Sequence, residues 1–143
     1  MATFNKFDDF AFQLGLGGMD LNANTLKVYL SDQLPVDASD TAYDIQVGTT
    51  GPAEFTGGTG YTAGGEDVTN LYTESPDGTG AMTGTDVTWT AGAADWGQFR
   101  YVVLYNETDA NQLIGYWDKV TPVTLGNGES FTVNFAATIL TIT

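Results

Sequence analysis

The stretch "FRYVVLYNETDANQLIGYWD", residues 99–118, predicts the centre of the fold. Its two apolar halves flank the acidic loop "NETDANQ", and both are rich in β-branched and aromatic residues, which is typical of strands. In "FRYVVLY" we expect one face to carry Phe99, Tyr101, Val103 and Tyr105 and the other to carry the alternate residues. Both faces are largely apolar, so this strand is expected to be covered on both sides. The favoured interpretation is a core hairpin, and the alternative is the aromatic wall of a ligand site.

Alternation with a period of two continues outside this hairpin and indicates further short strands. It is found in "LKVYLS" (26–31), "DVTWTA" (86–91), "SFTVNF" (130–135) and "TILTIT" (138–143). Several short strands with a single helical segment predict a mainly β fold, an antiparallel β-sandwich or jelly-roll-like domain with one short N-terminal helix. The side chains expected in its core are Trp89, Tyr101, Val103, Trp117, Phe131 and Phe135.

The N-terminal segment, residues 1–18, is the one helical pattern in the chain. In "TFNKFDDFAFQL" (3–14) the apolar residues recur three or four positions apart. Thr3 is the expected N-cap, and Gly15 is expected just past the helix end. This apolar stripe must pack on the main domain, residues 19–143, or on a partner. The candidate partner contacts on it are Phe4, Phe7 and Phe10.

Two glycine-rich stretches, residues 48–66 and 73–86, are expected to be long loops on the sandwich domain. The first, "GTTGPAEFTGGTGYTAGGE", lacks the large aliphatic residues from which a core is built, so it is mobile or ordered by a neighbour. Long loops on a rigid scaffold often carry binding residues. The candidate partner contacts in or near these loops are Phe55, Tyr61 and Trp96.

The composition excludes several classes of function. Four Lys and Arg stand against 18 Asp and Glu, for a net charge of -14, which opposes binding to nucleic acid or to an anionic membrane. There is no Cys and no His, so disulfides, thiolate sites and the commonest general base and metal ligand are absent. We expect no enzyme activity, no cofactor and no metal site. Arg100 is expected either to cap the edge of a strand or to pair with an acid across the sheet.

Weak motifs do not change this interpretation. "GGTGYTAGG" lacks the Lys-Ser/Thr pair of a phosphate-binding loop. The acidic pairs Asp8-Asp9 and Glu66-Asp67 do not have the spacing of a calcium loop. Two carboxylates suffice for glycoside hydrolysis, but nothing in the sequence selects which two. No apolar run suits a signal peptide or a membrane span, so we expect a soluble protein that keeps its N-terminus.

A set of segments in order along the chain resembles a family of small virion structural proteins of tailed bacteriophages. The segments are "MATFNKFDDFAFQLGLG", "LKVYLS", "GYTAGGEDVT", "DVTWTA", "FRYVVLYN", "LIGYWD", "ESFTVNF" and the closing "LTIT". The resemblance implies a non-enzymatic structural protein, and we favour a capsid decoration or cement role. It implies the major capsid protein as a partner. The N-terminal Phe stripe and the glycine-rich loop predict that copies of the chain also associate, as a dimer or trimer. The expected location is the outer capsid surface of the virion.

Two other functions remain open at this point. A tail or fibre-base adaptor of the same virion would also be β-rich and oligomeric, but it would be present in few copies. A carbohydrate-binding module would present exposed aromatic side chains from a sandwich, and Trp96 in "ADWGQF" is the expected platform for a sugar ring.

Overall fold

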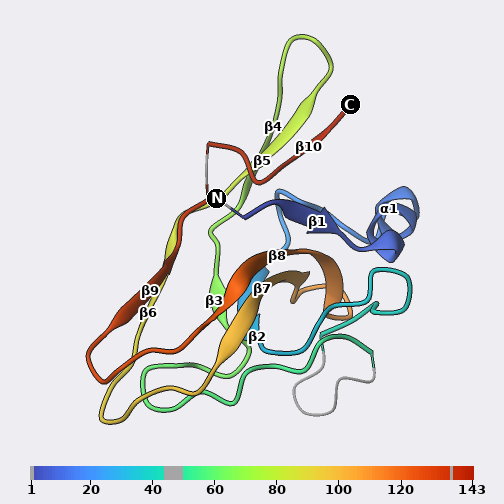
Figure 1. Ribbon diagram of the computed structural model, residues 1–143. Coiled ribbons are helices and arrows are strands. Elements are labelled where there is room, and N and C mark those ends of the chain that lie inside the picture. The colour runs from blue at the N-terminus through green and yellow to red at the C-terminus, as the bar shows by residue number, and fades with distance from the viewer. Residues whose placement is uncertain (1, 44–49, 136) are drawn as a thin grey trace.

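The computed structural model describes residues 2–43, 50–135 and 137–143, and it confirms a mainly β fold with antiparallel sheets and one short helix (Figure 1). The elements in chain order are β1 (Phe4–Lys6), α1 (Asp8–Gly15), β2 (Leu26–Ser31), β3 (Glu66–Asp67), β4 (Leu71–Glu74), β5 (Gly80–Thr83), β6 (Val87–Thr90), β7 (Phe99–Asn106), β8 (Gln112–Val123), β9 (Ser130–Val133) and β10 (Leu140–Ile142).

The main sheet has five strands in the order β1-β8-β7-β2-β3, and all its pairs are antiparallel. Strands β7 and β8 form the expected hairpin, and β7 lies at the centre of the sheet between β8 and β2. Both faces of β7 are buried, as the apolar pattern predicts: Val102 and Leu104 belong to one core cluster and Val103 and Tyr105 to the other. The core-hairpin interpretation of residues 99–118 is therefore confirmed.

The predicted facing of β7 is wrong at Phe99. Tyr101 pairs with Asp118 and Phe99 pairs with Val123, so residues 119–122 of β8 stand opposite Arg100 alone. Such a bulge breaks the strict alternation of side chains along the strands. Phe99 consequently packs in the same cluster as Val102 rather than with Tyr101.

The N-terminal segment differs from the predicted helix over 3–14. Phe4 pairs with Trp117, so the first residues form the edge strand β1 instead of a helical turn. The helix begins after Phe7, which is its N-cap residue in an extended conformation, and Gly15 is its last residue rather than the residue beyond it. By pairing with the open edge of β8, the backbone N–H and C=O groups of β1 form the hydrogen bonds that they would otherwise form within a longer helix. The pairing also puts the Phe4 ring against Trp117.

Residues 73–86 are not the loop that glycine content predicts. Strands β4 and β5 pair as a hairpin, and β10 joins β5 to give the sheet order β10-β5-β4 (Figure 1). The turn is closed by the hydrogen bonds Ser75 N–Thr79 O and Gly78 N–Ser75 O, and Gly78 has the positive φ that such turns require. At Gly80 a Cβ atom would overlap the Tyr72 ring, so glycine there lets Tyr72 lie across the sheet.

A third sheet pairs β6 with β9 and covers part of one face of the main sheet. Trp89 and Val133 of this pair belong to the same core cluster as Val102. The two strands are also joined on their outer side by hydroxyl contacts such as Thr88 Oγ1–Thr132 Oγ1. All the predicted core side chains are buried except Phe131, which is partly buried. The layered packing agrees with a sandwich, whereas the jelly-roll connectivity stays a prediction.

Candidate interaction surface

The side chains predicted to contact a partner lie mostly inside the domain. Phe7 is fully buried, and the exposed fractions of Phe10, Phe55 and Trp96 are 4%, 9% and 3%. Phe4 and Tyr61 are partly buried and pack against the core. The structure therefore brings these residues into the interior and leaves them little surface for a partner. Phe55 and Tyr61 contact each other and Trp96, so contacts within the chain hold them in place without a partner.

The glycine-rich stretch is anchored by Glu54, a buried carboxylate. Residues 48 and 49 of the predicted loop lie outside the described residues. From residue 50 onward the loop packs on β2, and Glu54 accepts hydrogen bonds from Tyr43 Oη (2.6 Å), Tyr61 Oη (2.8 Å) and the Gly64 amide (2.7 Å). Tyr61 Oη also accepts the Leu30 amide of β2 at 3.1 Å. These bonds satisfy a buried charge locally, which suits an anchor of the fold.

The tyrosines around Glu54 are poor acids in the folded state. Burial is the main cause that raises the pKa of Tyr29, Tyr43, Tyr61 and Tyr105, and the nearby Glu54 charge adds to it. They consequently stay neutral and act as hydrogen-bond donors. Tyr29 Oη donates to Pro52 O and Tyr105 Oη donates to Gly64 O, so both ends of the loop are fixed to the main sheet.

Trp96 does not form an exposed platform. Its indole packs against Phe55 and Tyr61, and its Nε1 donates to the Thr59 carbonyl at 3.1 Å. A sugar-stacking platform needs an exposed ring face, so the Trp96 site expected for a carbohydrate-binding module is not present in this conformation.

An apolar groove of about 430 Å³ separates the C-terminal end of α1 from the projecting sheet β10-β5-β4. Its apolar lining comes from Leu14 of α1, Met19, Leu21, Tyr72 of β4 and Ile142 of β10. Met19 and Leu21 are themselves buried, so the floor of the groove belongs to the core. The hairpin therefore stands as one wall of a depression whose lining is apolar.

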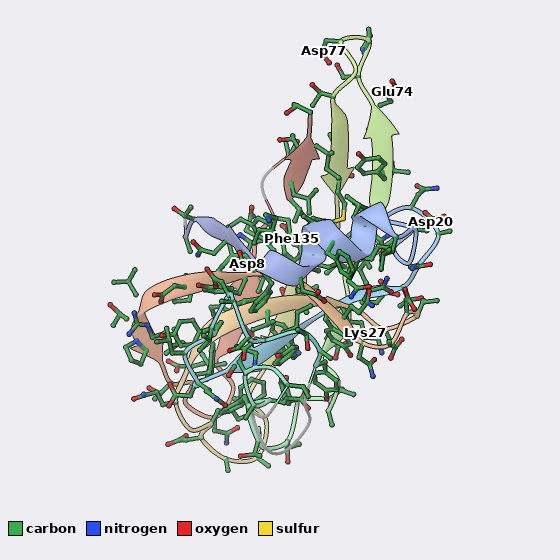
Figure 2. All side chains as sticks on the ribbon, turned by 90° about the vertical axis from the view of Figure 1, so that its right-hand side faces the viewer. Asp8, Asp20, Lys27, Glu74, Asp77 and Phe135 are labelled. Atoms are coloured by element: carbon green, nitrogen blue, oxygen red, sulfur yellow. The ribbon has the colours of Figure 1, made fainter. Side chains whose placement is uncertain are left out.

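One carboxylate lines this groove, and two more lie on the hairpin beyond it. Asp20 is one of its lining residues, and Glu74 follows Tyr72 by two positions on β4, which places both on one face of the strand. Figure 2 shows Glu74 and Asp77 on the hairpin and Asp20 beside α1. Hydrogen bonds from the Ala23 and Asn22 amides lower the pKa of Asp20, and bonds from Ser75 and Thr79 lower that of Asp77. Both groups therefore remain charged.

Further exposed apolar side chains lie on α1 and on its C-cap residue, Leu16. Phe12 and Leu16 are 62% and 65% exposed and are four residues apart, which puts them on one side of the helix. The sequence analysis instead chose Phe7 and Phe10 as partner contacts, and both are buried. An apolar stripe on a helix does not show which of its residues face the core. The groove residues Tyr72 and Ile142 were missed because they come from segments far apart in the sequence.

The basic residues are few, and two of them are paired. Arg100 binds Asp118 through Nε (2.7 Å) and Nη2 (2.8 Å), which confirms the predicted pair across the sheet. Lys27 binds Glu107. Within residues 2–43, 50–135 and 137–143 there is no group of three or more metal-ligating acids, and no helix there is long and apolar enough to cross a membrane.

Comparisons with protein-family models, with curated proteins and with solved structures found no match to this chain.

Proposed function

We propose that this chain is a non-enzymatic structural protein of a bacteriophage virion, a capsid decoration protein that reinforces contacts between major capsid subunits. The structural observation that carries the proposal is the groove beside the projecting sheet β10-β5-β4, which is lined mainly by apolar side chains and by Asp20. A β domain with an exposed groove of this kind is suited to binding a repeated surface. The ordered resemblance of segments along the chain points to the same class.

The stabilising effect follows from linkage. A protein that binds only the assembled shell shifts the equilibrium toward the assembled state. Copies that also touch one another gain avidity, because the second contact forms within one lattice. The proposed partners are therefore the major capsid protein and further copies of this chain, as a dimer or trimer.

The charge favours the outer surface of the shell. Packaged DNA would repel a chain of net charge -14, because 18 of its 22 charged residues are acidic. Two of the four basic side chains, Lys27 and Arg100, are already neutralised by carboxylates. These two residues therefore do not form a basic patch that could bind DNA.

The direct test is binding of the purified chain to shells that lack it. Glu74→Lys reverses a charge on β4, two residues from the groove residue Tyr72, whereas Glu66→Lys makes the same change in net charge on β3. We expect Glu74→Lys to weaken binding and Glu66→Lys to bind like the wild type. Equal binding by all three proteins, or binding by none, would contradict the proposal.

Copy number separates this function from the tail or fibre-base adaptor. Quantitative mass spectrometry of purified particles is expected to find a number comparable with that of the major capsid protein. A few copies per particle would instead favour the adaptor. Protease treatment of intact particles is expected to cleave the chain, because the proposed position is exterior.

A further inference from the structure

The sheet β6-β9 leaves one edge of β9 unpaired. Among the described residues β9 pairs with β6 alone, so its other edge has no strand partner there. Beside this edge is a groove of about 300 Å³, and the consecutive residues Phe131, Thr132, Val133 and Asn134 all line it. Lining by three consecutive residues of β9 and by the residue that follows it indicates that the groove runs along the strand's backbone.

The floor and the far side of this groove are apolar. Val102 and Trp117 form a directly opposed pair of β7 and β8 and line the groove from the main sheet. Strand β1 ends its pairing with β8 at Trp117, and Ala2 closes that end of the groove. Phe131 is only partly buried. A two-stranded sheet is too small to cover this face fully, and a third strand next to β9 would bury it.

One cation stands at the rim. Lys119 lines the groove, its Nζ lies 5.6 Å from the centre of the Phe131 ring, and no carboxylate among the described residues pairs with it. In a chain with 18 acids and four bases, a basic side chain held over an apolar groove attracts a negative group. The position of Lys119 therefore indicates that the ligand of this groove carries a carboxylate.

The backbone holds Lys119 there through an irregular bulge. Residues 119–122 of β8 stand opposite a single residue of β7, and Val120 has a φ of 65° although it is β-branched and 72% exposed. This conformation is costly for valine, and such outliers gather at functional sites. Bulges of this kind redirect neighbouring side chains. The Val120 amide is fixed to Asp118 Oδ1, and the same carboxylate binds Arg100.

We propose that this groove binds an extended segment of a partner protein, which pairs with the free edge of β9 and places a carboxylate beside Lys119. Backbone pairing along β9 supplies affinity, and the apolar pocket over Val102 and Trp117 takes one or two side chains, as in strand addition to other sheets. The carboxylate next to Lys119 fixes the register. This site is separate from the groove at α1, and it does not depend on the virion assignment.

The test uses hexapeptides of sequence Thr-Xaa-Thr-Xaa-Thr-Asp, with Xaa as Val, Leu or Phe, titrated into the isotope-labelled protein and followed by NMR. We expect at least one peptide to shift the amide resonances of residues 131–134 and of Lys119 while those of β4 and β5 stay in place. Replacing the peptide's Asp by Asn, or methylating a central amide nitrogen, is expected to weaken binding at least about tenfold, as befits a charge-assisted or backbone hydrogen bond.

Two matched variants of the protein test whether Lys119 is the cation that recognises the peptide's carboxylate. Lys119→Met keeps most of the apolar stem and is expected to lose the preference for Asp over Asn in the peptide. Lys27→Met makes the same change in net charge at β2 and is expected to keep that preference. Shifts confined to other regions, no binding by any peptide, or an unchanged preference in Lys119→Met would overturn the proposal. A wild-type dimer that Lys119→Met dissociates would also overturn it, since the occupant would then be a second copy.

Discussion

Tyr61 donates its phenolic proton to the buried carboxylate of Glu54 at 2.8 Å and accepts the Leu30 amide on the same oxygen. One hydroxyl thus joins the glycine-rich loop to the central sheet. Tyr61→Phe would remove both bonds and leave Glu54 and the Leu30 amide each short of a partner. We expect the free energy of unfolding to fall by about 1–3 kcal/mol, the cost of unsatisfied buried polar groups. Urea denaturation followed by circular dichroism measures it.

The control for this variant is Tyr72→Phe, which removes the hydroxyl of a partly buried tyrosine on the projecting hairpin. It is expected to change stability by less than about 0.5 kcal/mol, as surface substitutions usually do. If the two variants were equally stable, Glu54 would not be an anchor of the fold.

Trp96→Ala tests whether this side chain serves the core or a ligand. Its indole fills space between Phe55 and Tyr61, so its removal should leave a cavity and cost about 3–5 kcal/mol of stability. Thermal unfolding in a calorimeter gives the change. A variant as stable as the wild type that had lost binding to a glycan would restore the exposed-platform interpretation.

Val120→Gly should stabilise the protein. The valine side chain is 72% exposed and its φ is 65°, so glycine loses little burial and relieves the left-handed conformation. Relief of the backbone strain contributes about 1–2 kcal/mol, which exceeds the free-energy cost of ordering the more flexible glycine. The net gain in stability is roughly 0.5–1 kcal/mol. Urea midpoints compare the two proteins. A loss of stability would show that Val120 makes a contact that its exposure does not reveal.

Alkaline pH should unfold the protein through its buried tyrosines. In the unfolded chain tyrosine ionises near its ordinary pKa of 10.0, whereas burial raises the pKa of Tyr29 and Tyr61 in the folded state. The folded state then binds more protons, so stability is full below about pH 10 and falls above it. Each such tyrosine contributes a slope of about 1.4 kcal/mol per pH unit.

The measurement for alkaline unfolding is the ultraviolet absorbance of tyrosinate beside circular dichroism. Tyr116, whose pKa burial raises to about 12, belongs to the late-ionising group as well. We expect most tyrosinate to form together with loss of β structure. Full ionisation of the tyrosines near pH 10 with intact β structure would contradict the burial of their hydroxyls.

Deletion of residues 1–18 should damage the fold rather than association alone. Phe7 and Phe10 are buried in two different core clusters, and β1 pairs with β8. We expect the truncated chain to unfold at much lower urea concentration or to stay unfolded. Phe12→Ser keeps the segment and removes an exposed side chain, so it should fold normally. A stable truncated protein would return the segment to the role of a free partner contact.

The sequence predicted the strands of the centre well, because period-two runs of β-branched and aromatic residues have few alternative structures. The predicted facing of Phe99 was wrong because of the bulge in β8. A bulge depends on how two strands pair, and the periodicity of one strand does not reveal it. Glycine and threonine content suggested a loop at residues 73–86, where Met82 is in fact buried and directs hairpin pairing.

The interaction surfaces were the least predictable part. The groove at α1 joins Leu14, Tyr72 and Ile142, and the groove at β9 joins Val102, Lys119 and Phe131. Each set is assembled by topology from segments that lie far apart in the sequence. Arg100 and Asp118 are different: the lone arginine on an apolar strand suggested a pair with an acid across the sheet, and the hairpin places Asp118 beside it.

The burial of all three tryptophans gives the protein an optical signature. Trp89, Trp96 and Trp117 are each shielded from water, and Tyr61 lies about one ring diameter from two of them. Their fluorescence in the folded state should therefore be emitted at short wavelength, with excitation passed on from neighbouring tyrosines. Unfolding would shift the emission to the red and separate these donors from their acceptors. Trp117 alone borders the β9 groove, so a small change in emission without the red shift would report occupancy of that groove in an intact fold.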